Sequence, residues 1–425
     1  MFMLSGRVLL AVSPFLLAPA AVAGVLTVGP GAAHAQIADA IAVANDGDVI
    51  LVRTGTYASF AIDAKSLSVV ADAGANVTTN ESVYVRNLSS SQTAVVSGIR
   101  IEHLFNATPL TLENNAGHVR AQSVTAIGSQ YVFGGARPAL VMNNCADASF
   151  VACDFVGGGP EYGGLGYGHT GAPAILASSS VVTLHDCTAR GGDGLFGYSN
   201  PPNSITSGQP GEPALEFTGG QLFARGSNFQ GGAGGRGQST SACPTTGYEY
   251  ATGGGDGGPG IRATGTAATL VDVTTLGGTG GIGGTTGCGT QAYTGVTGLP
   301  VDPPSIVPIA APWMSMAVPA PAREGQQLSF TFNGPPGQRV ILATSAGASR
   351  TPLFQSVLLL SAPLRRVPMA IIPSGGILTV QLPVPTLAPG VDARLVHAQA
   401  AFVDPITAQT FVTSPSVIVM LDQSL

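Results

Sequence analysis

Five proline-led segments decide the fold of this sequence: Pro109-Leu110-Thr111-Leu112, Pro138-Ala139-Leu140-Val141, Pro173-Ala174-Ile175-Leu176, Pro213-Ala214-Leu215-Glu216 and Pro259-Gly260-Ile261-Arg262. Each is followed by a polar turn, a second short apolar segment and a closing glycine; these glycines are Gly128, Gly157, Gly191, Gly231 and Gly277. The distance from each proline to its closing glycine varies by no more than one position, whereas the gap to the next proline widens steadily, over 128–138, 157–173, 191–213 and 231–259. A constant cassette with a variable insert is typical of stacked coils, in which the cassette stacks and the insert projects from one face.

The cassette indicates strand, turn and strand, because it has little helical periodicity. One aligned position is occupied by Val124, Cys153, Cys187, Ser227 and Val273. We expect these small side chains to stack inside the coils at roughly 4.8 Å per coil.

Shorter coils are expected upstream, where apolar runs such as 49–52 and 66–70 continue the pattern. Before them, Ile37, Ala40, Ile41 and Ala44 follow the spacing of an amphipathic helix. Because the open end of such a stack needs a cover, we expect this helix to cap it.

The run Gly47-Asp48-Val49-Ile50-Leu51-Val52-Arg53-Thr54-Gly55-Thr56-Tyr57 resembles the opening motif of pectin-lyase-like right-handed β-helix proteins. In that family a helix leads into a "GD-x-I-x-V-x-x-GTY" pattern. The resemblance covers about residues 25–300 and implies the fold. It does not specify an activity, because this fold carries lyases, hydrolases, epimerases and adhesins.

Four regions follow from these patterns. Residues 1–23 resemble a signal peptide, with Arg7 before an apolar run and a small-x-small site at Ala21-Val22-Ala23; the alternative is an uncleaved anchor. Residues 24–299 form the predicted right-handed parallel β-helix, and 300–312 form a proline-rich linker. Residues 313–425 contain short alternating stretches separated by turns, which predicts a small β-sandwich and an all-β protein as a whole.

The composition limits the classes of partner. The formal net charge is −6 and only 9% of residues are charged, so no basic patch for nucleic acid is expected. We expect no transmembrane segment after signal cleavage, because no later stretch is long and apolar enough. Export would place the protein outside the cell, as a secreted or cell-surface protein.

The sequence shows no catalytic, metal or cofactor site. A polysaccharide lyase or hydrolase of this fold needs clustered carboxylates. Asp186 and Asp272 occupy equivalent cassette positions, but Gly226 lies between them, which predicts a separation of two coils, about 10 Å. We interpret them as solvated or turn-bonding residues, and Arg190 and Arg225 nearby as ion-pair partners.

The inserts carry the candidate binding residues. Of the 59 glycines, 43 lie between Gly128 and Gly298, and we expect them to serve tight turns. The tyrosines proposed to bind are Tyr162, Tyr167, Tyr198, Tyr248, Tyr250 and Tyr293. A flat ring with a hydroxyl suits polysaccharide or a cell-surface glycan, although these rings could instead only fix the inserts to the stack.

Two functions remain open at this stage. The first is a non-catalytic binding or structural protein of the cell surface. The alternative is a polysaccharide lyase or glycoside hydrolase whose groove lies beside the inserts.

Cys243 and Cys288 are predicted to form a disulfide. Cys243 follows Gly231 at almost the same distance as Cys288 follows Gly277, so both occupy equivalent places in consecutive inserts. Stacking brings such positions within the distance that a disulfide needs. Cys153 and Cys187 are expected to stay reduced in the interior, and Cys145 to lie in a turn.

Overall fold

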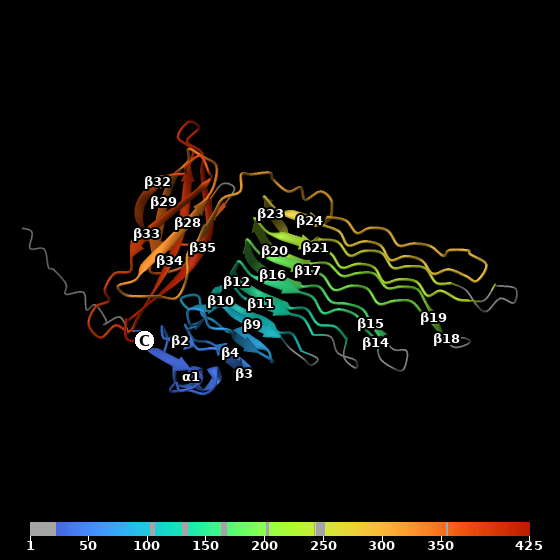
Figure 1. Ribbon diagram of the computed structural model, residues 1–425, viewed down its shortest axis with the longest axis horizontal. Helices are drawn as coiled ribbons and strands as arrows, with labels where there is room; N and C mark the ends of the chain where they lie inside the picture. The colour runs from blue at the N-terminus through green and yellow to red at the C-terminus, as the bar shows by residue number, and fades with distance from the viewer. Residues whose placement is uncertain are drawn as a thin grey trace, which may run out of the picture.

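The computed structural model describes residues 23–102, 107–129, 135–162, 168–200, 204–241, 243, 251–353 and 356–425. The predicted signal peptide therefore lies almost wholly outside the described residues. The described chain is nearly all strand, with one helix, and its largest sheets are parallel (Figure 1). This confirms an all-β protein.

The main body contains two large parallel sheets. The 13-stranded sheet contains β1 (Val25–Val28), β2 (Val49–Val52), β4 (Phe60–Asp63), β5 (Ser68–Ala71), β7 (Val83–Arg86), β8 (Thr93–Ser97), β10 (Leu110–Gln122), β12 (Leu140–Val151), β16 (Ile175–His185), β20 (Leu215–Arg225), β22 (Ile261–Thr264), β23 (Ala267–Val271) and β25 (Val301–Asp302). The eight-stranded sheet contains β3 (Gly55–Tyr57), β6 (Val77–Thr79), β9 (Ile99–Glu102), β11 (Thr125–Ile127), β13 (Asp154–Val156), β17 (Thr188–Arg190), β21 (Asn228–Gln230) and β24 (Thr274–Leu276).

The cassettes pair in parallel at equivalent positions. The first large apolar residue after each proline pairs with its counterpart in the next cassette, through Leu110, Leu140, Ile175, Leu215 and Ile261. Leu110 directly follows its proline, whereas the other four are the second residue after theirs. The turn expected inside the cassette is a corner within one continuous strand in β10, β12, β16 and β20.

A second corner ends each of these strands. Its residues all have positive φ: Gly98, Ser123, Ala152, Asp186, Gly226 and Asp272. This column places Gly226 between Asp186 and Asp272, as the sequence alignment predicts. Asp is among the residues that tolerate this left-handed conformation best.

The interior of the stack is apolar and tightly filled. Val124, Cys153, Cys187 and Ser227 are all at most 2% exposed, and the backbone N–H of Cys187 donates to Ser227 Oγ. Cys145, expected in a turn, lies at the first corner, where it is buried next to Asn115.

The predicted N-terminal helix is present as α1 (Ile37–Val43). Ile37, Ala40 and Ile41 are buried, and the helix packs on β1, β2 and β4 at the end of the stack. With seven residues, α1 is too short to cross a membrane, and the described chain contains no helix that could.

The C-terminal module begins after the proline-rich segment. That segment also contributes to the stack, because Val301 pairs with Ile261 and Ile309 bridges Val271. One module sheet contains β26 (Ser315–Ala317), β28 (Gln327–Asn333) and β33 (Ile377–Pro383). The other contains β27 (Ala322–Arg323), β35 (Thr410–Leu421), β34 (Ala393–Val403), β29 (Arg339–Ser345) and β32 (Arg365–Ile371), beside a hairpin of β30 (Thr351–Leu353) and β31 (Ser356–Leu358).

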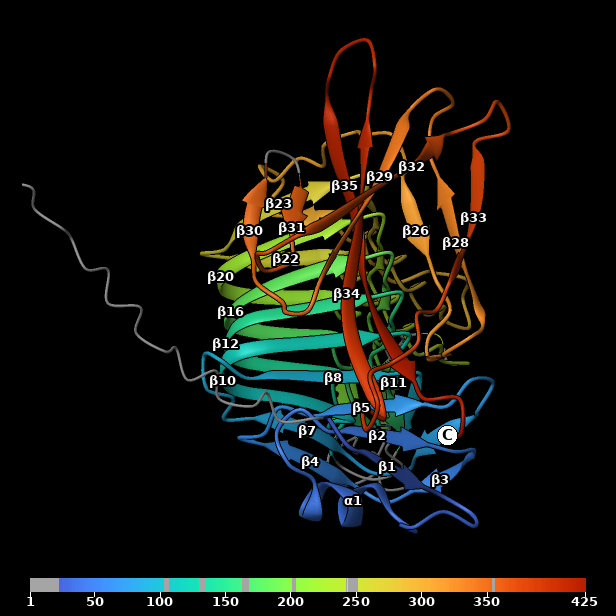
Figure 2. The same cartoon turned by 90° about the vertical axis from the view of Figure 1, so that its left-hand side faces the viewer.

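The module packs along one face of the stack. Figure 2 shows β34 and β35 running across the stacked strands. Val49, Leu51 and Val70 of the stack share an apolar cluster with Val419 and Leu421 of β35. At the other end of this contact, Arg225 donates to the carbonyl oxygen of Val412 at 2.9 Å.

Replacing Phe150 by alanine should lower the free energy of unfolding by about 3–5 kcal/mol, because its ring is fully buried and contacts Phe155 edge to face. Chemical denaturation followed by circular dichroism measures the change. Val43→Ala, at a side chain that is 61% exposed, is the control and should cost less than about 0.5 kcal/mol. Equal costs for the two variants would contradict a packed interior at Phe150.

Candidate functional site

The inserts leave the stack on the side opposite the C-terminal module and run as long extended segments (Figure 1). Each begins where a strand of the eight-stranded sheet ends, so that Gly191 follows β17 and Gly231 follows β21. We name the described parts of the inserts between Gly128 and Pro300 the glycine plate.

Hydrogen bonds in the plate recur at every third residue. Each insert has an outgoing segment, which leaves the stack, and a returning segment, which leads back to it. The outgoing segments of consecutive inserts pair in parallel, because the backbone N–H groups of Gly231, Gly234 and Gly237 donate to the carbonyl oxygens of Leu276, Thr279 and Ile282. Returning segments do the same, because Gly254, Gly257 and Gly260 donate to Tyr293, Val296 and Leu299. A period of three residues is that of the extended polyproline-II helix, which has no internal hydrogen bonds and therefore offers its backbone to neighbours.

Outgoing and returning segments are also joined to each other. One zigzag of N–H to carbonyl bonds crosses the plate from Gly158 to Arg137, Ala172 to Gly158, Gly192 to Ala172, Glu212 to Gly192, Gly232 to Glu212, Gly258 to Gly232, Gly278 to Gly258 and Gly298 to Gly278. All eight distances lie between 2.8 and 3.1 Å. The inserts thus form two layers, one of outgoing and one of returning segments, which are hydrogen-bonded to each other; we call this arrangement the double layer.

Glycine is required by close approach. A Cβ added to Gly232 would lie 1.9 Å from the carbonyl oxygen of Gly192, and one added to Gly255 would lie 2.0 Å from that of Gln209. The expectation that the insert glycines serve tight turns is therefore wrong for these positions, because neither has positive φ. The sequence signal that identifies them is glycine at every third residue, as at 231, 234 and 237 or 254, 257 and 260.

In the three-residue repeat of the inserts, two residues are glycines or other small residues packed within the double layer, and the side chain of the third points away from it. Arg236 and Asp256 are exposed, while the glycines on either side of them are mostly buried. In the last insert these outward positions include three exposed apolar or aromatic side chains, because Tyr293 is 63% exposed, Val296 56% and Ile282 53%; Thr279 and Thr285, on either side of Ile282, are exposed as well. The plate therefore has two broad faces on which side chains stand at fixed intervals.

The predicted binding tyrosines lie on the inserts, but only one can be placed in full. Tyr293 is on the last returning segment. Tyr162 belongs to a hairpin of β14 (Glu161–Tyr162) and β15 (Gly168–His169), and Tyr198 to one of β18 (Tyr198–Asn200) and β19 (Ser204–Thr206). The side chains of Tyr162 and Tyr198, and all of Tyr167, Tyr248 and Tyr250, lie outside the described residues.

The predicted disulfide is present. Cys243 and Cys288 are bonded across consecutive inserts, with their Cα atoms 5.2 Å apart. It lies beyond the last outgoing pair, in which Thr240 donates to Thr285. The covalent bond therefore links the two consecutive inserts beyond this hydrogen bond.

The Asp186 carboxylate lies against the C-terminal module. Asp186 is largely buried beside Ser414 of β35, and burial raises its pKa to about 6; the Asp272 carboxylate acts in the same direction and Arg225 opposes it. Arg225 itself donates to carbonyl oxygens of Val412 and Pro312. This cluster is thus covered by the C-terminal module.

The remaining candidate groups have structural partners. Arg190, interpreted as an ion-pair residue, lies 3.1 Å from Asp193. Asp154, a further carboxylate on the cassettes, accepts a hydrogen bond from Thr188. Within the described ranges, no three His, Cys, Asp or Glu side chains gather as metal ligands.

No family model and no curated protein matches this sequence.

Gly255→Ala should open the plate, because its methyl group would meet the Gln209 carbonyl, and overpacking of this kind typically costs about 1–3 kcal/mol. Gly255 donates to the carbonyl oxygen of Gly235 and accepts a hydrogen bond from the backbone N–H of Gly281. Hydrogen exchange should therefore be at least tenfold faster for the backbone amides around Gly235 and Gly281. Gly253→Ala is the matched control, since its nearest neighbour would be 3.5 Å away. If both variants exchange like the wild type, the plate is not held by this contact.

Asp186→Asn should stabilise the protein at neutral pH. The unfolded chain loses this proton near pH 3.8 and the folded chain near 6. Raising the pH through this window therefore favours the unfolded state and lowers the free energy of unfolding by up to about 3 kcal/mol.

Denaturation at pH 4 and pH 7 tests this expectation. Asp186→Asn and the wild type should be similar at pH 4, and the variant more stable at pH 7. Asp39→Asn, at an exposed carboxylate of α1, controls for the loss of one negative charge. A variant less stable than the wild type at pH 7 would show that the charged carboxylate is favourable there.

Proposed function

We propose that the protein is a secreted or cell-surface binding protein without catalytic activity, and that its glycine plate contacts a polysaccharide. In this proposal the stack is a right-handed parallel β-helix of the pectin-lyase-like kind, and the C-terminal module is a β-sandwich. The order in which each coil visits equivalent strands, and the opening motif from Gly47 to Tyr57, support that assignment. The disulfide and the signal-like N-terminus support export.

The observation that carries the proposal is the hydrogen-bonded double layer. Because two of every three residues are used in bonding or close packing, the third is presented at intervals of about 9 Å along each segment. A backbone fixed in this way loses little conformational freedom on binding. A flat, regular surface suits an extended polymer better than a compact ligand.

The chemistry of the plate favours sugars with little charge. Tyr293 presents a ring and a hydroxyl beside Val296 on one face. The described outward positions carry few charges, among them Asp193, Arg236 and Asp256, and these are of both signs. Aromatic rings that combine an apolar face with a hydroxyl can stack on sugars and also hydrogen-bond to them.

The alternative, a polysaccharide lyase or hydrolase, is favoured by one observation. A carboxyl group with a pKa of about 6, such as Asp186, matches a general acid. The position of Ser414 and the bond from Arg225 to Val412 weigh against it, because they place the C-terminal module over this group. The module thus packs against the side of the stack on which Asp186 lies.

Tyr293→Ala should weaken binding to the preferred polysaccharide about tenfold, as expected for an exposed aromatic contact worth about 1.4 kcal/mol. Affinity electrophoresis against a panel of neutral and acidic polysaccharides measures the change. Ile406→Ala, at a 92% exposed side chain of the C-terminal module, should leave binding unchanged.

The same panel distinguishes the two functions. Absence of binding to every polysaccharide would refute the proposal. Release of unsaturated products or new reducing ends by the wild type, lost in Asp186→Ala, would establish the enzyme instead.

A further inference from the structure

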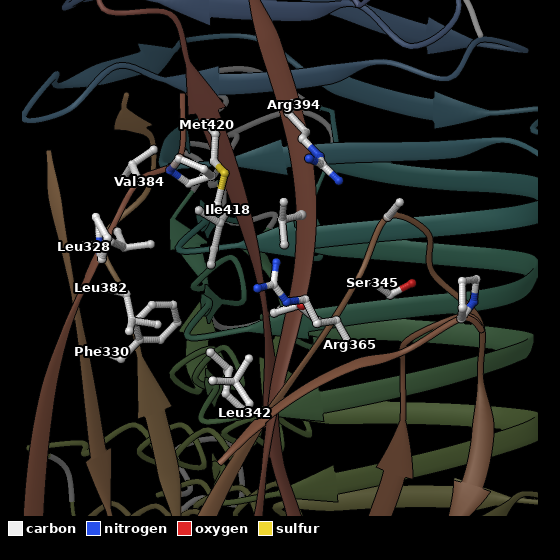
Figure 3. A pocket seen from close by; sticks show the side chains of 17 residues that line it. Leu328, Phe330, Leu342, Ser345, Arg365, Leu382, Val384, Arg394, Ile418 and Met420 are labelled. Atoms are coloured by element: carbon white, nitrogen blue, oxygen red, sulfur yellow. The ribbon is translucent and has the colours of Figure 1, made fainter. Parts of the chain in front are cut away.

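A cavity lies between the two sheets of the C-terminal module (Figure 3). Its volume is about 520 Å³, within the range of small-molecule sites. Leu328 and Phe330 of β28 line one side, and Leu342 of β29 and Ile418 of β35 line the other. These four side chains are at most 4% exposed, so the floor of the cavity is apolar and removed from water.

The opposite end of the module is filled. Phe332 packs on Phe330 and on Phe402, with ring centroids 6.1 and 6.5 Å apart. Met314 and Met316 are buried in the same core. The sheets are thus held together by aromatic packing at one end, and the space between them remains open at the other.

Two arginines stand at the rim of the cavity. Arg365 of β32 and Arg394 of β34 both line it and are exposed. Figure 3 shows Arg394 near the end of the cavity marked by Met420, and Arg365 lower in the view, nearer Leu342. Neither has a carboxylate partner among the described residues, and all four acidic residues of the module lie outside the lining.

We propose that this cavity binds a free long-chain carboxylate. The apolar floor accepts the hydrocarbon chain, whose burial is favourable in proportion to its area. The two guanidinium groups supply the charge that complements the carboxylate, and Arg binds such groups with paired hydrogen bonds. This site is separate from the glycine plate and does not depend on the function proposed for it.

The proposal is tested with dodecanoate, below its micelle concentration, by titration calorimetry on the full chain. We expect one molecule bound per chain, with dodecan-1-ol binding at least tenfold more weakly and dodecyltrimethylammonium more weakly still. The double variant Arg365→Gln/Arg394→Gln should raise the dissociation constant for dodecanoate at least tenfold. Arg366→Gln is the matched control, because Arg366 adjoins Arg365 in β32 but does not line the cavity.

A second variant tests the cavity itself. Val396→Phe fills the space beside Ile418 and should block dodecanoate and dodecan-1-ol alike. Thermal denaturation of each variant without ligand shows whether it is folded, and dodecanoate should raise the midpoint of the wild type and of Arg366→Gln.

Three outcomes would overturn the proposal: no binding of dodecanoate by the wild type, an unchanged dissociation constant in the folded double variant, or equal binding of the cationic amphiphile. Capture by anionic phospholipid vesicles without binding of dodecanoate would likewise overturn it and indicate a membrane surface as the partner.

Discussion

Parallel hydrogen bonding between equivalent residues of successive coils is the constraint on which the rest of this structure depends. The pairing that joins Arg190 to Gln230 at the end of β17 and β21 continues without interruption, because Gly191 then donates to Gln230. The inserts therefore inherit their alignment from the stack. At the boundary between the stack and the plate, the repeat of the backbone conformation changes from two residues in the strands to three residues in the inserts. Glycine allows that change, since neighbouring segments approach too closely for a Cβ.

The growth of the inserts has a physical explanation in the same geometry. Along the series 128–138, 157–173, 191–213 and 231–259, each gap is longer than the one before it by the same six positions. That increment equals one three-residue turn on the outgoing segment and one on the returning segment, so each of these layers extends one turn beyond the layer before it. Gly192 pairs with Glu212 and Gly232 with Gly258, which shows that the hairpins remain aligned as they lengthen. The inserts thus lengthen by whole three-residue repeats, which keeps the hydrogen bonds between outgoing and returning segments aligned.

Much of the stack could be predicted because its signal is local and repeated. The proline-to-glycine distance gave the register of the strands, and the shared offset of Cys243 and Cys288 gave the disulfide. The number of glycines does not predict the double layer, because abundant glycine also suits turns; the spacing of three is the feature that identifies it. The contact between the module and the stack could not be predicted, since it joins residues such as Arg225 and Val412 that no sequence pattern relates.

That contact also decides how the ionisable residues should be interpreted. Arg225 could be expected to pair with Asp186, because both lie at the same edge of the stack. Instead its guanidinium donates to backbone carbonyls and lies over the ring of Phe411. Asp186 is left largely buried near a like charge, which is why its pKa rises. In many enzymes a raised carboxyl pKa marks the active site. Here the same value follows from the burial of Asp186 against the C-terminal module. In the plate the backbone is satisfied by hydrogen bonds between segments, and outward carboxylates such as Asp256, which accepts a hydrogen bond from the backbone N–H of Val296, bond to the neighbouring segment as well.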